Sequence, residues 1–275
     1  MVLTGAANGI GAATARRLLD AGATVATLDR DGDTLDHLAR QLGPAFRPVT
    51  GDVRDPEALR RTVAAIGGSV DGLVVNAAHA DLAPVIGGDA DEAEEMIEIN
   101  LLGAWRTLRE VVPALRRPGG RVVLVTSTSV AVTPQLYGPY AASKAGLEGL
   151  ANAFTIEVRP HGISVGLLTL HSVDTPTYQR VIGDERLQPM VDRLPPVAFR
   201  AMSASDAARA VIRALASNRR RTFAPWWAAL PLLSPVLTQA GFDAVGRLTG
   251  ATRLPAGAAA IPDPVPADDR SATAS

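Results

Sequence analysis

The stretch Val2-Leu3-Thr4-Gly5-Ala6-Ala7-Asn8-Gly9-Ile10-Gly11 decides how the chain folds. Its first residues are apolar or β-branched and predict a short strand, and residues 12–19 have the pattern of a helix. Gly5, Gly9 and Gly11 suit, in turn, a tight turn, the close approach of a pyrophosphate and close packing of the helix. We therefore expect Gly5, Asn8, Gly9, Ile10 and Gly11 to bind a dinucleotide, with the helix N-terminus facing the anion.

Strand and helix patterns alternate along the rest of the chain. Strand-like runs follow at 23–28, in a segment ending at 49, and at 72–75, 121–126 and 163–168; helical patterns cover 33–42, 56–66, 90–115, 140–158 and 203–217. Most of the strands are apolar throughout, which is typical of a parallel sheet covered on both faces. The predicted fold class is α/β: a single Rossmann-like, doubly wound parallel sheet with helices on both faces.

We expect one dinucleotide-binding and catalytic domain over residues 1–254, with residues 171–240 surrounding the substrate. Residues 255–275 are rich in Ala, Pro, Asp and Ser and predict a disordered tail. Residues 223–237 are apolar but interrupted by Pro225, Pro231 and Pro235, which favours core or lid over a membrane-interface segment. The first strand is short, and we expect more apolar residues upstream of it to add stability.

Composition excludes several classes of protein. Of 275 residues, 47% are hydrophobic and 20% charged, and the net charge is -1, which disfavours both a disordered chain and a nucleic-acid binder. The absence of cysteine excludes disulfides and thiolate chemistry. No leader pattern opens the chain, so we expect a cytoplasmic protein. His37, His79, His161 and His171 show no metal-ligand spacing, and we expect no metal.

Lys144 is the only lysine among 27 basic residues. It lies four residues after Tyr140, so the two side chains share a face of the predicted helix. A nearby ammonium favours the phenolate, and we expect Lys144 to lower the pKa of Tyr140 and make it a general acid/base. Tyr137 is the competing phenol, but the residue four positions after it is Ala141.

Asp29 lies at the end of the second predicted strand, where a carboxylate can bind both hydroxyls of an adenosine ribose. The same carboxylate would repel a 2'-phosphate, so NAD is favoured as cofactor and NADP is less favoured. The adjacent Arg30 keeps NADP open as the alternative.

The glycine loop together with Tyr140-x-x-x-Lys144 resembles the short-chain dehydrogenase/reductase family. Similar elements continue to about residue 176: Asp52-Val53, Asn76-Ala77-Ala78, Asn100-Leu101-x-Gly103, Ser127 and Val173-Asp174-Thr175-Pro176. The resemblance implies that Asp52 and Val53 contact the adenine and that Asn76, Ala77, Val173 and Thr175 also contact the cofactor.

The resemblance also implies a reaction, which is hydride transfer between a nicotinamide and a carbinol or carbonyl carbon. Ser127 would position the substrate oxygen, although Thr128 and Ser129 are close enough to compete for that role. Tyr140 would transfer the proton, and Lys144 would bind the nicotinamide ribose. Asn100 would hold a water that links the lysine to solvent.

Four residues depart from the family's pattern: Val75 and Ala78 after the fourth strand, which puts the local hydrogen bonds there in doubt, and Leu170-His171 where the family has Pro-Gly. His171 could therefore touch cofactor or substrate. Trp226 and Trp227 suggest an apolar lid and hence a hydrophobic secondary alcohol or ketone as substrate. Alternative hypotheses are a catalytically idle dinucleotide-binding or regulatory protein, and a reductase bound peripherally to membranes. The family further suggests a homo-oligomer.

Overall fold

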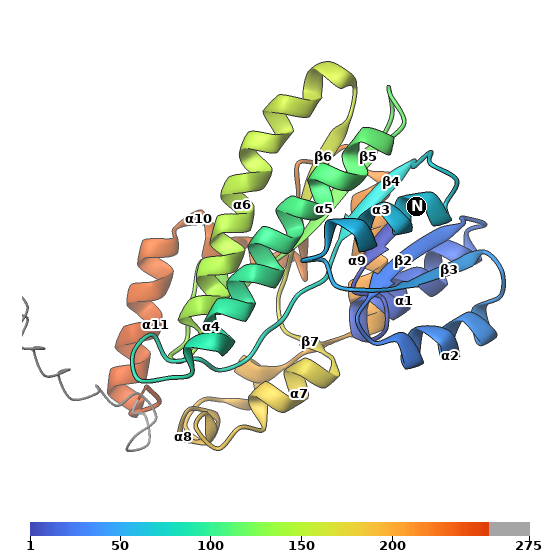
Figure 1. Ribbon diagram of the computed structural model, residues 1–275. Helices are drawn as coiled ribbons and strands as arrows, with labels where there is room; N and C mark the ends of the chain where they lie inside the picture. The colour runs from blue at the N-terminus through green and yellow to red at the C-terminus, as the bar shows by residue number, and fades with distance from the viewer. Residues whose placement is uncertain (253–275) are drawn as a thin grey trace, which may run out of the picture.

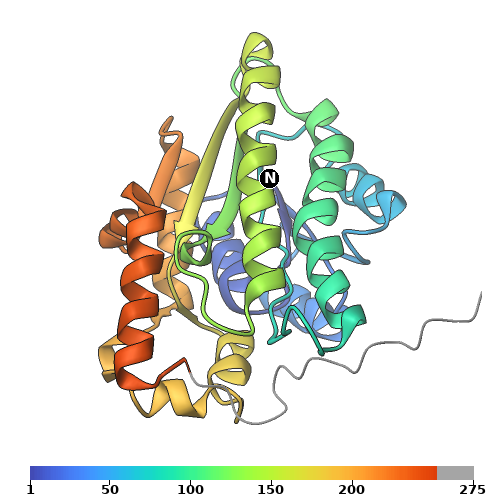
Figure 2. The same cartoon turned by 90° about the vertical axis from the view of Figure 1, so that its left-hand side faces the viewer.

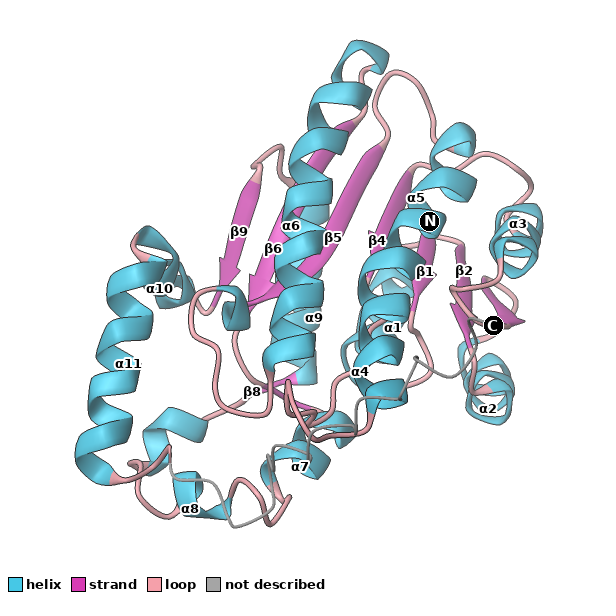
Figure 3. Ribbon diagram, turned by 60° about the vertical axis from the view of Figure 1, so that its left-hand side comes forward, coloured by secondary structure: helices cyan, strands magenta, loops and turns pink. Residues whose placement is uncertain are grey.

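A computed structural model of the chain describes residues 1–252, and the tail predicted at 255–275 lies outside the described residues. The core is a sheet of seven parallel strands in the order β3-β2-β1-β4-β5-β6-β9 (Figures 1 and 3). Its strands are β1 (Val2–Thr4), β2 (Val25–Asp29), β3 (Phe46–Thr50), β4 (Gly72–Val75), β5 (Arg121–Ser127), β6 (Ser164–Leu170) and β9 (Arg221–Ala224). A separate two-stranded pairing joins β7 (Val173–Asp174) to β8 (Met202–Ser203).

Helices connect these strands and cover the sheet (Figure 3). They are α1 (Gly9–Asp20), α2 (Gly32–Leu42), α3 (Pro56–Ala65), α4 (Ala90–Ile97), α5 (Ala104–Val111), α6 (Gly138–Val158), α7 (Pro176–Ile182), α8 (Gln188–Val191), α9 (Ala204–Ala216), α10 (Leu230–Leu233) and α11 (Pro235–Thr249). Together they confirm the predicted doubly wound α/β class.

Alternate residues of the strands face opposite sides of the sheet and form two apolar cores. On one side, Leu3 and Val123 pack with α1, α2 and α9. On the other, Val2 and Val122 pack with α5 and α6, which cross the front of the sheet in Figure 2. Both faces of the strands are therefore buried, as their apolar sequences predict.

The helix predicted at 90–115 is continuous in direction but irregular in winding. A π-helical turn, Glu98–Gly103, separates α4 from α5, and a 3-10 turn, Val112–Ala114, ends the helix at Pro113. At Gly103, an added Cβ would lie 2.6 Å from Val53 Cγ2. The absence of a side chain there lets the helix pack closely against the segment after β3. Helix α1 also differs slightly, beginning at Gly9 inside the glycine loop.

The C-terminal apolar segment differs most from expectation. Its first residues, Phe223 and Ala224, complete β9, a seventh strand that the sequence patterns did not predict. The remainder forms a 3-10 turn, Trp226–Ala229, then α10 and the start of α11, and most of its large side chains are exposed. The prediction of core is therefore wrong for most of the large side chains beyond Ala224, because the prolines divide the segment into short turns that leave them outside. Ala228 is buried and Trp227 contacts His171, so a lid stays a prediction.

The carboxyl ends of the seven strands meet at one edge of the sheet. The chain moves from β1 to β2 and β3 on one side and then returns to β4 on the other, so the edge between β1 and β4 is a topological switch point. Ligands of doubly wound sheets bind at such a point. Within residues 1–252, no helix has the length and hydropathy of a membrane span.

Candidate active site

The glycine loop has the geometry of an anion cradle. Gly5 and Gly9 have φ of 73° and 52°, a backbone conformation that residues with a side chain rarely adopt. A Cβ on Gly11 would lie 1.7 Å from the Gly5 carbonyl oxygen. Helix α1 has no acidic residue in its first turn, and the Asn8 side chain does not cap it. The N-terminal amides of α1 thus remain available to an anion, and the loop fits a dinucleotide pyrophosphate.

Asp29 ends β2 beside this loop. Its two carboxylate oxygens accept hydrogen bonds from the Ala7 amide (2.9 Å) and the Asp31 amide (3.1 Å). The neighbouring Arg30 guanidinium turns to Glu95 on α4, at 3.3 Å. Asp29 therefore fixes the glycine loop to the end of β2 while lining the cavity where a ribose would bind.

A small cavity of about 90 Å³ collects five predicted cofactor residues, which are Gly5, Asp29, Asp52, Val53 and Ala77. In its wall, Asp52 accepts hydrogen bonds from the backbone amide (2.8 Å) and guanidinium (2.7 Å) of Arg54. Burial acts to raise the pKa of Asp52, but the Arg54 bonds outweigh it and hold that pKa below its ordinary value. The carboxylate stays ionised at this end of the site.

The loop after β4 is tied to β1 by residues that the sequence analysis did not single out as a pair. Thr4 Oγ1 accepts hydrogen bonds from the Asn76 and Ala77 amides, each at 3.2 Å. The Asn76 side-chain amide donates to the Thr4 and Gly5 carbonyls at 3.1 and 2.9 Å. The hydrogen bonds that the departures at Val75 and Ala78 placed in doubt are thus supplied by Asn76 and Thr4.

A second cavity of about 360 Å³ contains the predicted catalytic side chains Ser127, Tyr140 and Lys144. Ser127 ends β5, and Tyr140 and Lys144 lie on α6, which packs against β5 and β6. Ile10, Asn76, Val173 and Thr175 also line it, and Ala78 borders both cavities. Most of the predicted catalytic and cofactor-binding residues therefore line two adjacent cavities at the carboxyl edge of the sheet, whereas Asn8, Gly9, Gly11 and Asn100 line neither.

The electrostatics of the Tyr140–Lys144 pair differ from the sequence-based expectation. Burial raises the pKa of Tyr140 to about 12, and the interaction with Ser127 offsets only part of this. Burial also lowers the pKa of Lys144 to about 8. Lys144 Nζ lies 5.8 Å from the Tyr140 ring centre and donates to the Val125 carbonyl at 3.3 Å. The pKa of Tyr140 is therefore raised and not lowered as expected, because burial outweighs the hydrogen bond with Ser127.

Asn100 lies in the π-helical turn and is 1% exposed. Its side-chain oxygen accepts from the His79 amide (2.7 Å), and its amide nitrogen donates to the His79 carbonyl (2.8 Å) and to Ser143 Oγ (2.9 Å). Ser143 Oγ in turn donates to the Tyr140 carbonyl (2.7 Å). Asn100 thus links the loop after β4 to the backbone of Tyr140, a positioning contact that the sequence analysis did not predict.

His171 follows β6 at the site of the departure from the family's pattern. Its Nδ1 lies 3.2 Å from Thr128 Oγ1, and its ring meets the Trp227 ring edge-on at 4.8 Å between centres. Burial lowers the pKa of His171, so the imidazole is neutral at neutral pH. It lines the larger cavity, as the sequence analysis anticipated, whereas Trp226 is 76% exposed on the outside.

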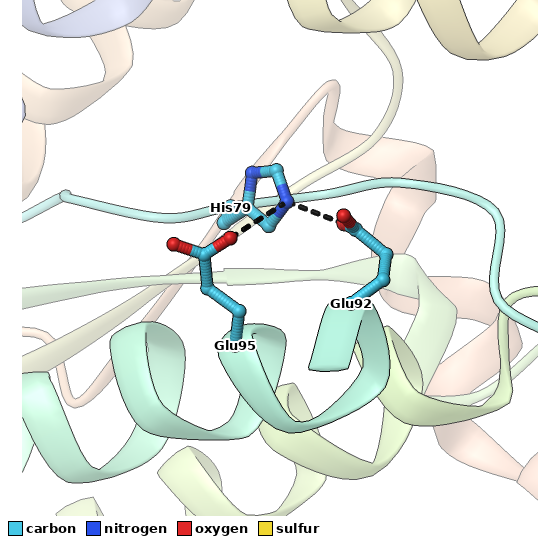
Figure 4. A group of neighbouring side chains, drawn as sticks. All are labelled: His79, Glu92 and Glu95. Carbon is cyan, nitrogen blue, oxygen red and sulfur yellow. Dashed lines mark hydrogen bonds and ion pairs between the residues drawn. The ribbon is translucent and has the colours of Figure 1, made fainter. Parts of the chain in front are cut away.

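His79 brings together a second group of ionisable side chains at the rim of the small cavity (Figure 4). Its Nε2 lies 2.5 Å from Glu92 Oε1 and 3.9 Å from Glu95 Oε2, both on α4. These three could ligate a cation, but the other oxygen of Glu95 pairs with Arg30 and with Arg54, at 3.3 and 3.4 Å. Because two guanidinium groups pair with Glu95, the geometry favours an ion-pair network over a cation site.

Comparison with known proteins agrees with this geometry. The family model for short chain dehydrogenases matches residues 1–186. Oxidoreductase asL5 of Sarocladium schorii is 30% identical over 222 residues, covering 79% of this chain and 88% of that protein. The 3-dehydrosphinganine reductase TSC10B of Arabidopsis thaliana is 32% identical, covering 65% of this chain but only 56% of that protein. The crystal structure of 3-hydroxyacyl-CoA dehydrogenase type-2 from Mycobacterium avium superposes with a TM-score of 0.70 at 22% identity, covering 82% and 94% of the two chains.

The chain belongs to the short-chain dehydrogenase/reductase family. It is an enzyme of that class, an oxidoreductase of CH–OH groups that uses a nicotinamide dinucleotide. The geometry of its own site bears on the substrate, on the choice between NAD and NADP and on the roles of individual residues.

Proposed function

We propose that the chain interconverts a hydrophobic secondary alcohol and the corresponding ketone, with NAD as cofactor and Tyr140 as general acid/base. The observation that carries this proposal is the convergence of Ser127, Tyr140 and Lys144 on one cavity whose wall is mostly apolar. The bound nicotinamide would supply or accept the hydride, and the protein would supply orientation and proton transfer.

Tyr140 is the proton donor when the ketone is reduced. With a pKa of about 12, its phenol is protonated throughout the neutral range and can give its proton to the developing alkoxide. Ser127 stands at the end of β5 and would donate a hydrogen bond to the same oxygen. In the oxidation direction Tyr140 would accept the proton of the alcohol, so it must first lose its own. Ser127 would bind the same oxygen in both directions.

Lys144 and Asn100 support Tyr140 in different ways. Lys144 is held by the Val125 carbonyl with the rest of its ammonium directed to the cavity region, where it would bind the ribose hydroxyls. Asn100 is a positioning residue on this account, since it acts on Tyr140 through Ser143. Asn100 would also hold a water that links Lys144 to solvent.

The preference for NAD is argued from Asp29. Its carboxylate lines the small cavity, and Arg30, the nearest cation along the chain, is engaged by Glu95. A ribose 2'-phosphate would meet the carboxylate of Asp29 without a free guanidinium to offset the repulsion.

Replacement of Asp29 tests this preference. In Asp29→Ser, the ratio of kcat/KM for NADP to kcat/KM for NAD should rise about tenfold or more, equivalent to about 1.4 kcal/mol. Asp33→Ser, which removes an exposed carboxylate four residues away, should leave the ratio unchanged. If wild-type enzyme already prefers NADP, or if the ratio does not respond to Asp29→Ser, the assignment of NAD is wrong.

An apolar substrate is supported by a cluster of buried apolar side chains that borders the larger cavity and is called the cavity cover. Leu82, Leu136, Val181, Leu187 and Met190 form an apolar cluster where α7 and α8 meet the loops after β4 and β5. Steady-state assays of NADH formation should give higher kcat/KM for secondary alcohols with long or cyclic hydrocarbon groups than for short polar ones. Faster turnover of small polyols would contradict the proposal.

We also propose a cytoplasmic enzyme that works as a homo-oligomer. The oligomer is supported by the outer faces of α5 and α6, where Trp105 is 40% exposed and Ile156 is 63% exposed. Exposed large apolar side chains on neighbouring long helices are suited to an isologous contact.

A further inference from the structure

Helix α11 is built with its apolar side outward. Leu237, Val245 and Leu248 lie on one face at helical spacing, and Leu248 is 88% exposed. We define the apolar stripe as Leu230, Leu233, Val236, Leu237, Val245 and Leu248, with Trp226 at its N-terminal end. All of them are exposed, and Figures 1 and 3 show α10 and α11 at the outer edge of the molecule, beyond β9.

The inward side of the same helix explains why it is held in this orientation. Gln239 accepts a hydrogen bond from the Thr133 amide at 2.8 Å, and its own amide donates to Asp243 at 2.9 Å. Phe242 packs against the cavity cover. The polar and aromatic contacts fix α11 on the protein, so the outward stripe is a feature of the folded chain. Contiguous exposed apolar surfaces of this kind mark interaction sites.

Charge distribution indicates what the stripe contacts. Between residues 223 and 252 only Asp243 and Arg247 are charged, so the stripe itself offers no ionic or directional contacts. Exposed Arg247 lies beside the stripe on α11, and around α8 the exposed Arg193 and Arg200 are accompanied by exposed Glu185 and Asp192. A protein partner would require hydrogen bonds at its rim, whereas hydrocarbon requires none and anionic headgroups would complement the arginines.

We propose that the apolar stripe is a docking surface for an anionic lipid bilayer. Trp226 at one end suits the boundary between hydrocarbon and headgroups. The stripe would lie in the interface plane, since it belongs to short helices packed on a folded domain. Docking does not depend on the proposed function, but it has a consequence for it. The face of α11 opposite the stripe lines the substrate cavity through Phe242, so a lipid-dissolved alcohol or ketone would be concentrated beside the cavity cover.

Co-sedimentation of the full-length protein with vesicles tests the docking surface. We expect wild-type protein to pellet with vesicles of phosphatidylcholine and phosphatidylglycerol in equal parts, and less with phosphatidylcholine alone. The variant Leu237→Ser/Leu248→Ser should lower the bound fraction about tenfold, because binding scales with inserted apolar area. Val85→Ser/Ile86→Ser, which removes two exposed apolar side chains elsewhere, is the matched control and should bind as wild type.

Two further measurements separate the alternatives. Brominated lipids should quench the tryptophan fluorescence of wild-type protein more than that of Trp226→Phe. Light scattering after size exclusion, without vesicles, should give the same molar mass for wild type and the stripe variant. Failure of wild-type protein to pellet, equal pelleting of the stripe variant, or a loss of oligomer in the stripe variant would overturn the proposal, the last result assigning the stripe to a second copy of the chain. Cofactor titration of the same samples reports on the proposed function separately.

Discussion

Lys144 shows how a single side chain connects composition to chemistry. It is the only lysine of the chain, it is 3% exposed, and its ammonium donates to the Val125 carbonyl. Burial lowers its pKa to about 8, which a guanidinium could not match, since arginine remains charged in proteins. On the proposed mechanism the site needs a compact cation whose charge responds to its surroundings, and a chain that otherwise uses arginine has a lysine here.

Substitution by arginine tests this requirement. Lys144→Arg keeps the formal charge but places a larger, planar group in a filled site, and we expect kcat/KM to fall about a hundredfold or more. Circular dichroism should show a folded protein. Ala64→Arg adds a guanidinium at an exposed position of α3, away from the site, and should retain nearly full activity. Retention of activity in Lys144→Arg would show that any buried cation suffices.

At the scale of elements, the glycines of the first loop and of α6 show when a missing side chain matters. Gly11 lies against the Gly5 carbonyl, and Gly5 itself has a positive φ. Gly149, in the middle of α6, has open space where a Cβ would be, and its conformation is helical. The same residue type is therefore required in one helix and dispensable in the other.

Alanine substitutions should separate the two cases. Gly11→Ala forces a Cβ into backbone, and we expect a loss of unfolding free energy of about 3 kcal/mol or more, or failure to fold. Gly149→Ala should raise the unfolding free energy by up to about 1 kcal/mol, because alanine favours the helix and restricts the unfolded chain. Urea unfolding measures both. Equal effects of the two substitutions would contradict the close packing seen at Gly11.

The elements also show what local patterns can predict. The alternation of apolar strands and amphipathic helices predicted β1, β2, β3, β4, β5 and β6 and the helices between them. Strand β9 escaped, because Phe223-Ala224 stands directly before Pro225 in a proline-rich stretch. The π-helical turn around Asn100 escaped as well, because it depends on packing against Val53 from another part of the chain. Long-range contacts of this kind leave no periodic signal.

At the scale of the whole molecule, the site residues were predictable because parallel strands end at one edge. Asp29, Asn76 and Ser127 lie at the carboxyl ends of three different strands, and the topology alone brings them together. The acidity of Tyr140 was not predictable, because it depends on how much of the phenol the folded domain removes from water. The outward face of α11 was also hidden, since an apolar run does not reveal which side it buries.

Stability as a function of pH follows from the same burial. The folded-state pKa of Lys144, about 8, is below its ordinary value, so between those two values the unfolded chain binds more protons and stability rises with pH. Lys144→Met removes this charge, and we expect the variant to be more stable than wild type at pH 7, with the difference shrinking toward pH 10. Denaturant midpoints at a series of pH values measure the difference. A gap independent of pH would mean that Lys144 is neutral or well solvated.

The account depends most on Tyr140 as the group that transfers the proton. The direct test is single-turnover oxidation of NADH by a ketone substrate, compared between wild type and Tyr140→Phe, with NADH affinity measured by fluorescence. We expect the rate to fall about a thousandfold or more, while NADH affinity changes little, because the ring remains and only the hydroxyl is lost. An unchanged rate in Tyr140→Phe would contradict the mechanism, and no turnover by wild-type enzyme on any alcohol or ketone would favour a catalytically idle dinucleotide-binding protein.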